Sequence, residues 1–119
     1  MTDCIFCKII AKEAPANIVF ENEEFLAFSP IETASKGHTL LIPKKHFESI
    51  FDFERHSLER LMGCAQDIAK DLVASDEATG INLLHASGKD AQQSVFHFHL
   101  HIVPRYKDDG LDLWFRNNL

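Results

Sequence analysis

The sequence feature that most constrains this chain is a strict alternation of histidine with large apolar residues over positions 97–102, which read His-Phe-His-Leu-His-Ile. A β-strand directs successive side chains to opposite faces, so in a strand the three imidazoles share one face and the apolar groups share the other. We therefore predict a strand over residues 96–103, ended by Pro104. Imidazoles two residues apart along a strand lie about 6.5–7 Å from each other, close enough to address one ligand.

Three histidines at this spacing favour a functional role over a half-buried strand whose polar face is histidine by accident. One interpretation is a metal site, because neutral imidazole is a common ligand of zinc. The other is covalent catalysis, in which one imidazole is the nucleophile and its neighbours orient it and bind an anion. The alternation alone does not choose between these two interpretations.

Weaker patterns predict the other secondary-structure elements. Apolar residues recur at helical spacing between residues 54 and 75, which indicates one long amphipathic helix. A short helix is predicted over residues 4–12, and short apolar runs predict strands at 18–21, 25–28, 38–43 and 81–84. These elements give the α+β class with an antiparallel sheet, and 119 residues fit a single domain over positions 1–119.

Composition argues against several classes of function. The formal net charge is −6 and the lysines form no basic stripe, so nucleic acid is not an expected partner. No apolar run reaches the roughly 18 residues of a membrane span, and the first residues lack the features of a signal peptide. We therefore expect no membrane partner and a cytoplasmic location. The three cysteines then argue against a disulfide framework, and Cys64 falls on the apolar face of the long helix.

Cys4 and Cys7 form a C-x-x-C pattern that has three interpretations. A redox pair normally opens a helix after a strand, and no strand is predicted before Cys4. A zinc site needs four ligands, so two cysteines make at most half of one, and His46 and His97 are available to complete it. Two unrelated thiols are the third interpretation.

Several segments together resemble the histidine triad (HIT) superfamily. Residues 97–103 match its signature, in which histidine alternates with apolar residues and two apolar residues follow the third histidine. Residues 4–10 resemble the opening helix of the family, and residues 37–46 resemble its second motif. Residues 93–96 lead into the triad as in family members, and Pro104-Arg105 follows as in the bacterial branch. The resemblance covers nearly the whole chain, in order and at family spacing.

The resemblance implies a HIT-like fold, with a five-stranded antiparallel sheet, a short N-terminal helix and one long central helix, in a protein that forms a homodimer. It implies a nucleotide-binding enzyme in which His99 attacks the α-phosphorus of a nucleoside phosphoramidate, a nucleotidyl ester or a dinucleotide polyphosphate. Water would then hydrolyse the nucleotidyl-histidine intermediate. The alternative is a nucleotide-binding or signalling module with little physiological catalysis.

The resemblance also implies roles for individual residues of this sequence. His101 would bind phosphate oxygens, His38 would support the triad, and Gln93 and Ser94 would contact the phosphate and the leaving atom. Four apolar residues would surround the base, although each is also an ordinary core residue by composition: Phe6, Ile9, Phe28 and Ile31. Relatives that carry C-x-x-C pair it with two histidines around a structural zinc, which here implies the ligands Cys4, Cys7, His46 and His97. No organic cofactor is implied.

The sequence departs from the family pattern at two places. Pro30 stands where many members have a carboxylate that binds the ribose hydroxyls, and proline offers no side-chain acceptor. The loop over residues 86–92 lacks the usual asparagine before Gly88, and it has Gln92 in place of the usual glycine. We therefore expect that ribose or leaving-group preference differs from that of relatives. Neither His56 nor His85 receives a role.

Overall fold

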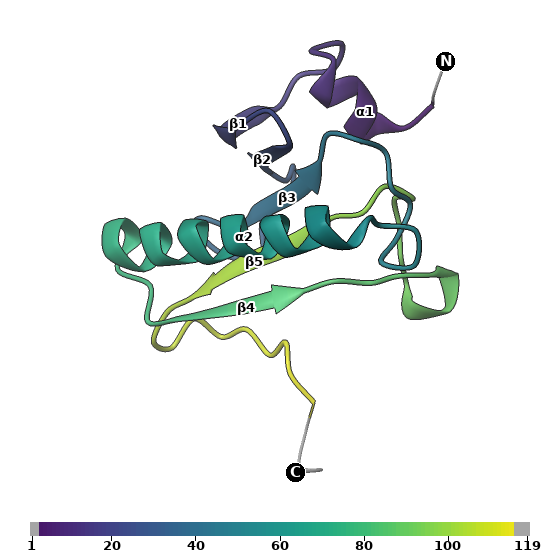
Figure 1. Cartoon of the computed structure of the whole chain (residues 1–119). Coiled ribbons are helices and arrows are strands. Elements are labelled where there is room, and N and C mark those ends of the chain that lie inside the picture. Colours follow the sequence, from purple (N-terminus) through teal and green to yellow (C-terminus); the bar gives the residue numbers. More distant parts are fainter. Residues whose placement is uncertain (1–2, 116–119) are drawn as a thin grey trace.

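The computed structural model describes residues 3–115 and places five strands in one antiparallel sheet (Figure 1). The strand order is β1-β2-β3-β5-β4, so the last strand in sequence lies inside the sheet. The predicted α+β fold is confirmed. The bounds of the elements are α1 Ile5–Ile10, β1 Asn17–Glu21, β2 Phe25–Ser29, β3 Thr39–Pro43, α2 Arg55–Asp76, β4 Gly80–Leu84, the short 3-10 helix η1 Lys89–Ala91 and β5 Leu100–Arg105.

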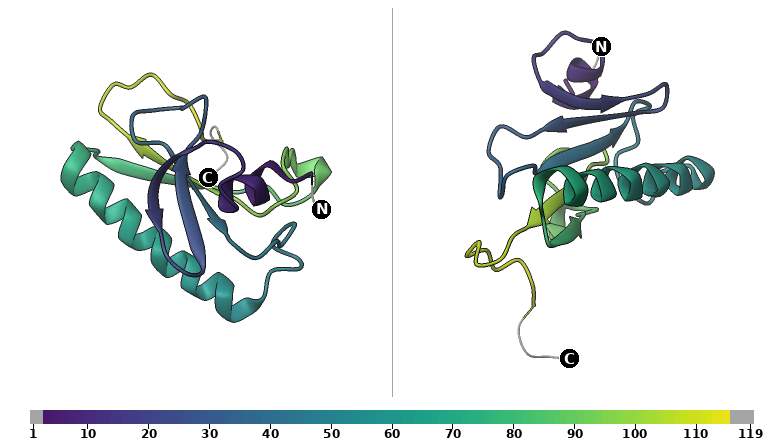
Figure 2. Two further views of the ribbon diagram at one scale, coloured as in Figure 1. Left: turned by 90° about the horizontal axis from the view of Figure 1, so that it is seen from above. Right: turned by 90° about the vertical axis from the view of Figure 1, so that its left-hand side faces the viewer.

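Both faces of the sheet are covered, each by one helix. In β2, Phe25 and Ala27 point into the apolar cluster that contains residues of α2, whereas Leu26 and Phe28 point into the cluster under α1. Helix α2 lies across β3 and β5 (Figure 1), and α1 lies beside the β1–β2 hairpin (Figure 2). A strand that is buried on both sides loses the alternation of polar and apolar residues, which explains the continuous apolar run in β2.

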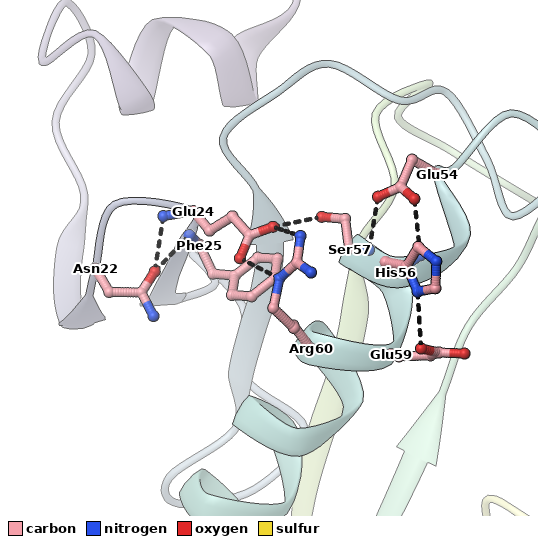
Figure 3. Close-up of polar contacts among 8 residues, drawn as sticks. All are labelled: Asn22, Glu24, Phe25, Glu54, His56, Ser57, Glu59 and Arg60. Atoms are coloured by element: carbon pink, nitrogen blue, oxygen red, sulfur yellow. Dashed lines mark hydrogen bonds and ion pairs between the residues drawn. The ribbon is translucent and has the colours of Figure 1, made fainter.

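The N-terminus of α2 is capped by Glu54, whose carboxylate accepts hydrogen bonds from the backbone N–H groups of His56 (2.9 Å) and Ser57 (2.8 Å) (Figure 3). These are two of the N–H groups that a helix leaves without a partner in its first turn. The helix ends at Glu77 in the left-handed conformation, with φ of 62°. The predicted bounds, 54–75, differ from the observed ones by one residue at each end.

A second polar cluster ties the turn between β1 and β2 to the start of α2 (Figure 3). The Glu24 carboxylate accepts hydrogen bonds from the Ser57 hydroxyl (2.9 Å) and from the guanidinium of Arg60 (2.6 and 2.8 Å). The turn itself is closed by the Asn22 side-chain oxygen, which accepts the backbone N–H groups of Glu24 and Phe25. These bonds fix the β1–β2 hairpin to α2, the helix that packs across β3 and β5.

The strand that carries the triad begins later than predicted. β5 starts at Leu100, so His97 and His99 precede it, and the prediction of a strand over 96–103 is wrong at this end. The backbone leaves the sheet because Phe98 N–H donates to the Phe47 carbonyl (2.7 Å), in the loop before α2. Side chains nevertheless alternate between the two faces as predicted. Phe98 packs in the apolar cluster on the α2 side of the sheet, the α2-side cluster, whereas the histidines do not.

The prediction was also wrong about Pro104, which lies inside β5 rather than after it. The pairing of β5 with β3 stops at Ile102, and the Pro104 carbonyl accepts the Ser35 hydroxyl (2.6 Å) from the loop before β3. The missing N–H of proline therefore removes no bond to β3, and the strand continues to Arg105 against β4. Within residues 3–115, no helix is long and apolar enough to cross a membrane.

Replacement of Leu61 tests the packing of α2 on the sheet. Leu61 is completely buried on the sheet-facing side of the helix, so we expect Leu61→Ala to lower the free energy of unfolding by about 2–5 kcal/mol. The adjacent Met62 is 43% exposed and serves as the control, because Met62→Ala should change stability by less than about 0.5 kcal/mol. If urea denaturation shows that Leu61→Ala and Met62→Ala lower the free energy of unfolding equally, this assignment of the buried face of α2 is contradicted.

The cap of α2 predicts a dependence of stability on pH. Hydrogen bonds from the backbone N–H groups of His56 and Ser57 lower the pKa of Glu54. Because the pKa of Glu54 is lower in the folded state, its carboxylate stabilises the folded protein fully at a pH above the pKa of an unfolded glutamate. This stabilisation is lost as the pH falls through the pKa of Glu54 in the folded state. The deficit in melting temperature of Glu54→Ala should therefore be largest near pH 7 and shrink in acid. Glu59→Ala, on the exposed side of the same helix, is the control.

Candidate functional site

Four metal-binding side chains from three separate segments meet beside α1. Cys4 is the N-cap of α1, Cys7 lies in its first turn, His46 follows β3, and His97 precedes β5. Their ligand atoms all lie within 4.8 Å of one another. The structure therefore brings together all four residues that the resemblance implied as zinc ligands.

The spacing of these atoms fits a tetrahedral ion. His97 Nδ1 lies 3.4 Å from Cys4 Sγ, 3.5 Å from Cys7 Sγ and 3.1 Å from His46 Nδ1. Cys7 Sγ lies 3.2 Å from His46 Nδ1. Zinc bonds of about 2.0–2.3 Å in a tetrahedron would separate the ligand atoms by roughly 3.3–3.8 Å. The donor set therefore fits zinc, and the two distances from His97 Nδ1 to sulfur lie in this range while the two to His46 Nδ1 are slightly shorter.

The protein orients His97 for this role. Its Nε2 lies 2.8 Å from the Pro43 carbonyl, which can only accept, so the proton sits on Nε2 and the lone pair of Nδ1 faces the cluster. Burial lowers the pKa of His97 to about 4, which keeps the ring neutral. Burial and the neighbouring Cys4 thiol raise the pKa of Cys7 to about 11, so a cation is needed to favour two thiolates side by side.

A second group of histidines surrounds a cavity of about 270 Å³ next to this cluster. Of the residues predicted from the sequence, five line it: His38, Gln93, Ser94, His99 and His101. The other lining residues are Ala34, Leu84, His85, Ala86, Ala91, Gln92, Val103 and Leu113. No carboxylate lines the cavity among the residues that the structure describes.

Hydrogen bonds fix the tautomers of His38 and His101. The backbone N–H of Ala34 donates to His38 Nδ1 (2.9 Å), so the proton of this ring is on Nε2. Nε2 then donates to His101 Nδ1 (3.0 Å), which leaves the proton of His101 on its own Nε2. Burial lowers the pKa of His38, and burial together with the neighbouring imidazoles lowers the pKa of His101 to about 4. His101 therefore presents a neutral N–H donor on the wall of the cavity.

His99 has the opposite arrangement. Its Nδ1 lies 2.9 Å from the His97 carbonyl, so Nδ1 carries the proton and Nε2 keeps a lone pair. Burial lowers the pKa of His99, whose exposed fraction is 7%. The ring centroids of His99 and His101 are 5.3 Å apart, and the ring of Phe6 packs edge-on against His99 at 5.2 Å. An imidazole with an available lone pair and an imidazole that presents an N–H donor thus stand side by side.

The predicted polar residues of the neighbouring loop differ in their contacts. Gln93 is buried, and its carboxamide bonds three backbone groups: Gly88 N–H (2.7 Å), the Glu48 carbonyl (2.6 Å) and the Val95 carbonyl (3.0 Å). It therefore holds the loop in shape. Ser94 is exposed at the cavity, where its hydroxyl is accessible.

The four residues predicted to surround a base do not line this cavity. Phe6, Ile9 and Phe28 are buried in the cluster under α1, and only Phe6 contacts a triad ring among the aromatic pairs. Ile31 is fully exposed in the loop after β2. Gln92, where the family has glycine, adopts the left-handed conformation with φ of 71°. Gln92 lines the cavity, and this φ imposes backbone strain on a residue other than glycine.

His85 belongs to the site although no pattern in the sequence assigned it a role. Its Nδ1 lies 3.0 Å from the carbonyl of His99, and its ring stacks on Phe98 with centroids 4.2 Å apart. Its position directly after the predicted strand at 81–84 was visible in the sequence, but the register that brings it beside His99 was not, since this depends on the pairing of Leu84 with His101.

Comparison with known proteins identifies the family. The family model described as HIT domain matches residues 11–108. The chain belongs to the HIT family. Protein hit from Bacillus subtilis is 45% identical over 109 residues, which cover 91% of this chain and 75% of that protein. The resemblance found in the sequence is thereby confirmed.

Solved structures of HIT proteins superpose closely on this one. A Zn-bound histidine triad family protein from Mycobacterium smegmatis has a TM-score of 0.89 at 38% identity, over 93% of this chain and 81% of that one. A hypothetical histidine triad nucleotide-binding protein from Sulfolobus tokodaii has a TM-score of 0.85 at 35% identity, over 96% and 76%. A HIT family hydrolase from Legionella pneumophila has a TM-score of 0.79 at 32% identity, over 96% and 98%.

The Cys/His cluster predicts that the protein binds one zinc ion per chain. Cys7→Ser removes one of the four ligands. Loss of a residue that only hydrogen-bonds to a metal ligand typically lowers metal affinity by about 10–100-fold, so zinc affinity should fall by more than this in Cys7→Ser. Competition with a chromogenic chelator measures the affinity. Cys64→Ser is the matched control, because Cys64 packs against the α2-side cluster, away from the four ligands. Wild-type affinity in Cys7→Ser would contradict the predicted ligand set.

Proposed function

We propose that this protein is a HIT-type nucleotide-binding hydrolase that cleaves its substrate at the α-phosphorus through a nucleotidyl-His99 intermediate. The observation that carries the proposal is the opposite tautomers of His99 and His101 at one cavity. Membership of the HIT family supports it, as do a nucleotide-binding relative and a hydrolase relative of the same fold. The substrate class is a nucleoside phosphoramidate, a nucleotidyl ester or a dinucleotide polyphosphate.

In the first step, the lone pair of His99 Nε2 attacks the α-phosphorus, and the bond from phosphorus to the leaving group breaks. The leaving group departs with the electron pair of that bond and takes a proton from the Ser94 hydroxyl, which regains one from water. His101 Nε2–H donates to a non-bridging phosphate oxygen and stabilises the charge of the transition state. The proton on His99 Nδ1 stays in its bond to the His97 carbonyl.

In the second step, water attacks the same phosphorus and the phosphorus–nitrogen bond breaks. The electron pair returns to His99 Nε2, and the proton lost by the water passes to solvent. The nucleotidyl imidazole is cationic because Nδ1 keeps its proton, so the ring is a good leaving group at this step. One difficult displacement is thus divided into two easier ones, which is the advantage of covalent catalysis.

A zinc ion at Cys4, Cys7, His46 and His97 would have a structural role. Four protein ligands close the coordination shell, so no position stays open for substrate or water. The bound ion would hold α1 to the segment that precedes β5. His97 would then be committed to the metal through Nδ1, while its backbone carbonyl holds the proton of His99.

A nucleotide-binding or signalling module with little catalysis is the second candidate. It is favoured by Pro30, which places no carboxylate where many relatives bind ribose, and by the cavity wall, which has none among the described residues. Tight binding of AMP without turnover of any phosphoramidate or dinucleotide polyphosphate would select this candidate. Assembly as a homodimer and a cytoplasmic location remain predictions.

Mass spectrometry after reaction with adenosine phosphoramidate tests the hydrolase. We expect an AMP adduct on His99 in the wild type, and we expect His99→Ala to lose the adduct and at least about 1000-fold in kcat/KM. His56→Ala is the control, because His56 lies exposed on α2, far from the cavity lining. Full turnover in His99→Ala would rule out covalent catalysis by this residue.

A further inference from the structure

His85 contacts the backbone of the proposed nucleophile where the sheet no longer supports it. The last rung between β4 and β5 pairs Leu84 with His101, and β5 begins at Leu100. The peptide of His99 therefore lies beyond the ladder, and within residues 3–115 no strand N–H donates to its carbonyl. The side chain of His85 supplies that donor instead, through Nδ1 at 3.0 Å.

The orientation of the His85 ring is fixed from two sides. A carbonyl oxygen only accepts hydrogen bonds, so His85 Nδ1 carries the proton and Nε2 is an acceptor. Nε2 accepts from the Ser87 hydroxyl, whose oxygen in turn accepts the backbone N–H of Ile50 (2.9 Å). The ring also stacks on Phe98, with an interplanar angle of 26°. Both nitrogens are thus engaged, which leaves neither of them for acid–base chemistry on a substrate.

We infer that His85 is a positioning residue for the nucleophile, holding the His99 carbonyl so that the Nε2 lone pair of His99 stays aimed at the cavity. This inference rests on the proposed function. Two bonds then restrain His99, one from its own Nδ1 to the His97 carbonyl and one from His85 to its carbonyl. Because a displacement of about 1 Å can cost about 100-fold in rate, loss of one restraint should slow attack on phosphorus.

Two substitutions of His85 separate the donor to His99 from the space that the ring fills. In His85→Asn, the amide nitrogen takes the place of Nδ1 and keeps a donor for the His99 carbonyl. In His85→Gln, the amide takes the place of Nε2, so the contact with Ser87 is kept and the donor to His99 is lost. His56→Gln makes the same exchange at an exposed histidine and serves as the control.

The first measurement is the single-turnover rate of adduct formation with adenosine phosphoramidate, together with the dissociation constant of AMP. We expect His85→Gln to slow adduct formation by about 10–100-fold while AMP affinity changes less than about threefold. His85→Asn should restore most of the rate, and His56→Gln should match the wild type. A residue that only fills space would give equal rates in His85→Asn and His85→Gln, and that result would overturn the inference.

The second measurement does not depend on catalysis. Proton–nitrogen NMR spectra of the histidine side chains, recorded without substrate, should show His99 with its proton on Nδ1 in the wild type and in His85→Asn. In His85→Gln the bond to the His97 carbonyl should keep the proton on Nδ1, but the His99 ring resonances should shift and broaden, because the His99 peptide has lost one of its two restraints. A His99 spectrum in His85→Gln identical to that of the wild type would also overturn the inference. If the wild type forms no adduct, the proposed function fails, while these spectra still decide the role of His85.

Discussion

β5 pairs with β3 on one side and β4 on the other, and this central position determines where the functional groups of the molecule lie. Leu100 and Ile102 of β5, and Phe98 just before it, join the α2-side cluster, so the histidines that alternate with them face the opposite side. The pairing with β3 brings His38 to His101, and the pairing with β4 brings His85 to His99. Burial of the apolar side chains on one face of this segment thus brings the histidines together on the opposite face.

Backbone groups assign a distinct role to each imidazole of this site. The Ala34 N–H makes His38 a donor to His101, and the His97 carbonyl leaves the lone pair of His99 on Nε2. The Pro43 carbonyl likewise turns the lone pair of His97 toward the cysteines. Chemically identical rings therefore present different atoms, a lone pair on Nδ1 in His97, a lone pair on Nε2 in His99 and an N–H donor in His101, because the peptide groups around them differ.

Period-2 and period-3.6 patterns predicted the α+β fold and the order of the elements. The resemblance to the HIT superfamily implied the cluster of Cys4, Cys7, His46 and His97, which the structure brings together. The period-2 pattern misplaced the start of β5, since a hydrogen bond from Phe98 to a distant loop overrides local strand preference. The base-binding role of Ile31, whose side chain is fully exposed, stays a prediction. His85 was missed because its contact depends on the register between two strands, which no local pattern reports.

The order of the strands in the chain differs from their order in the sheet, and this has a consequence for how the protein is made. β4 and β3 are both synthesised before β5, yet β5 separates them in the folded sheet. A ribosome-bound chain that has not reached residue 100 thus carries two strand edges with no neighbour between them. Such edges invite pairing with other chains. The sheet can close only when the last strand emerges, so newly made protein passes through a stage in which both of these edges are exposed.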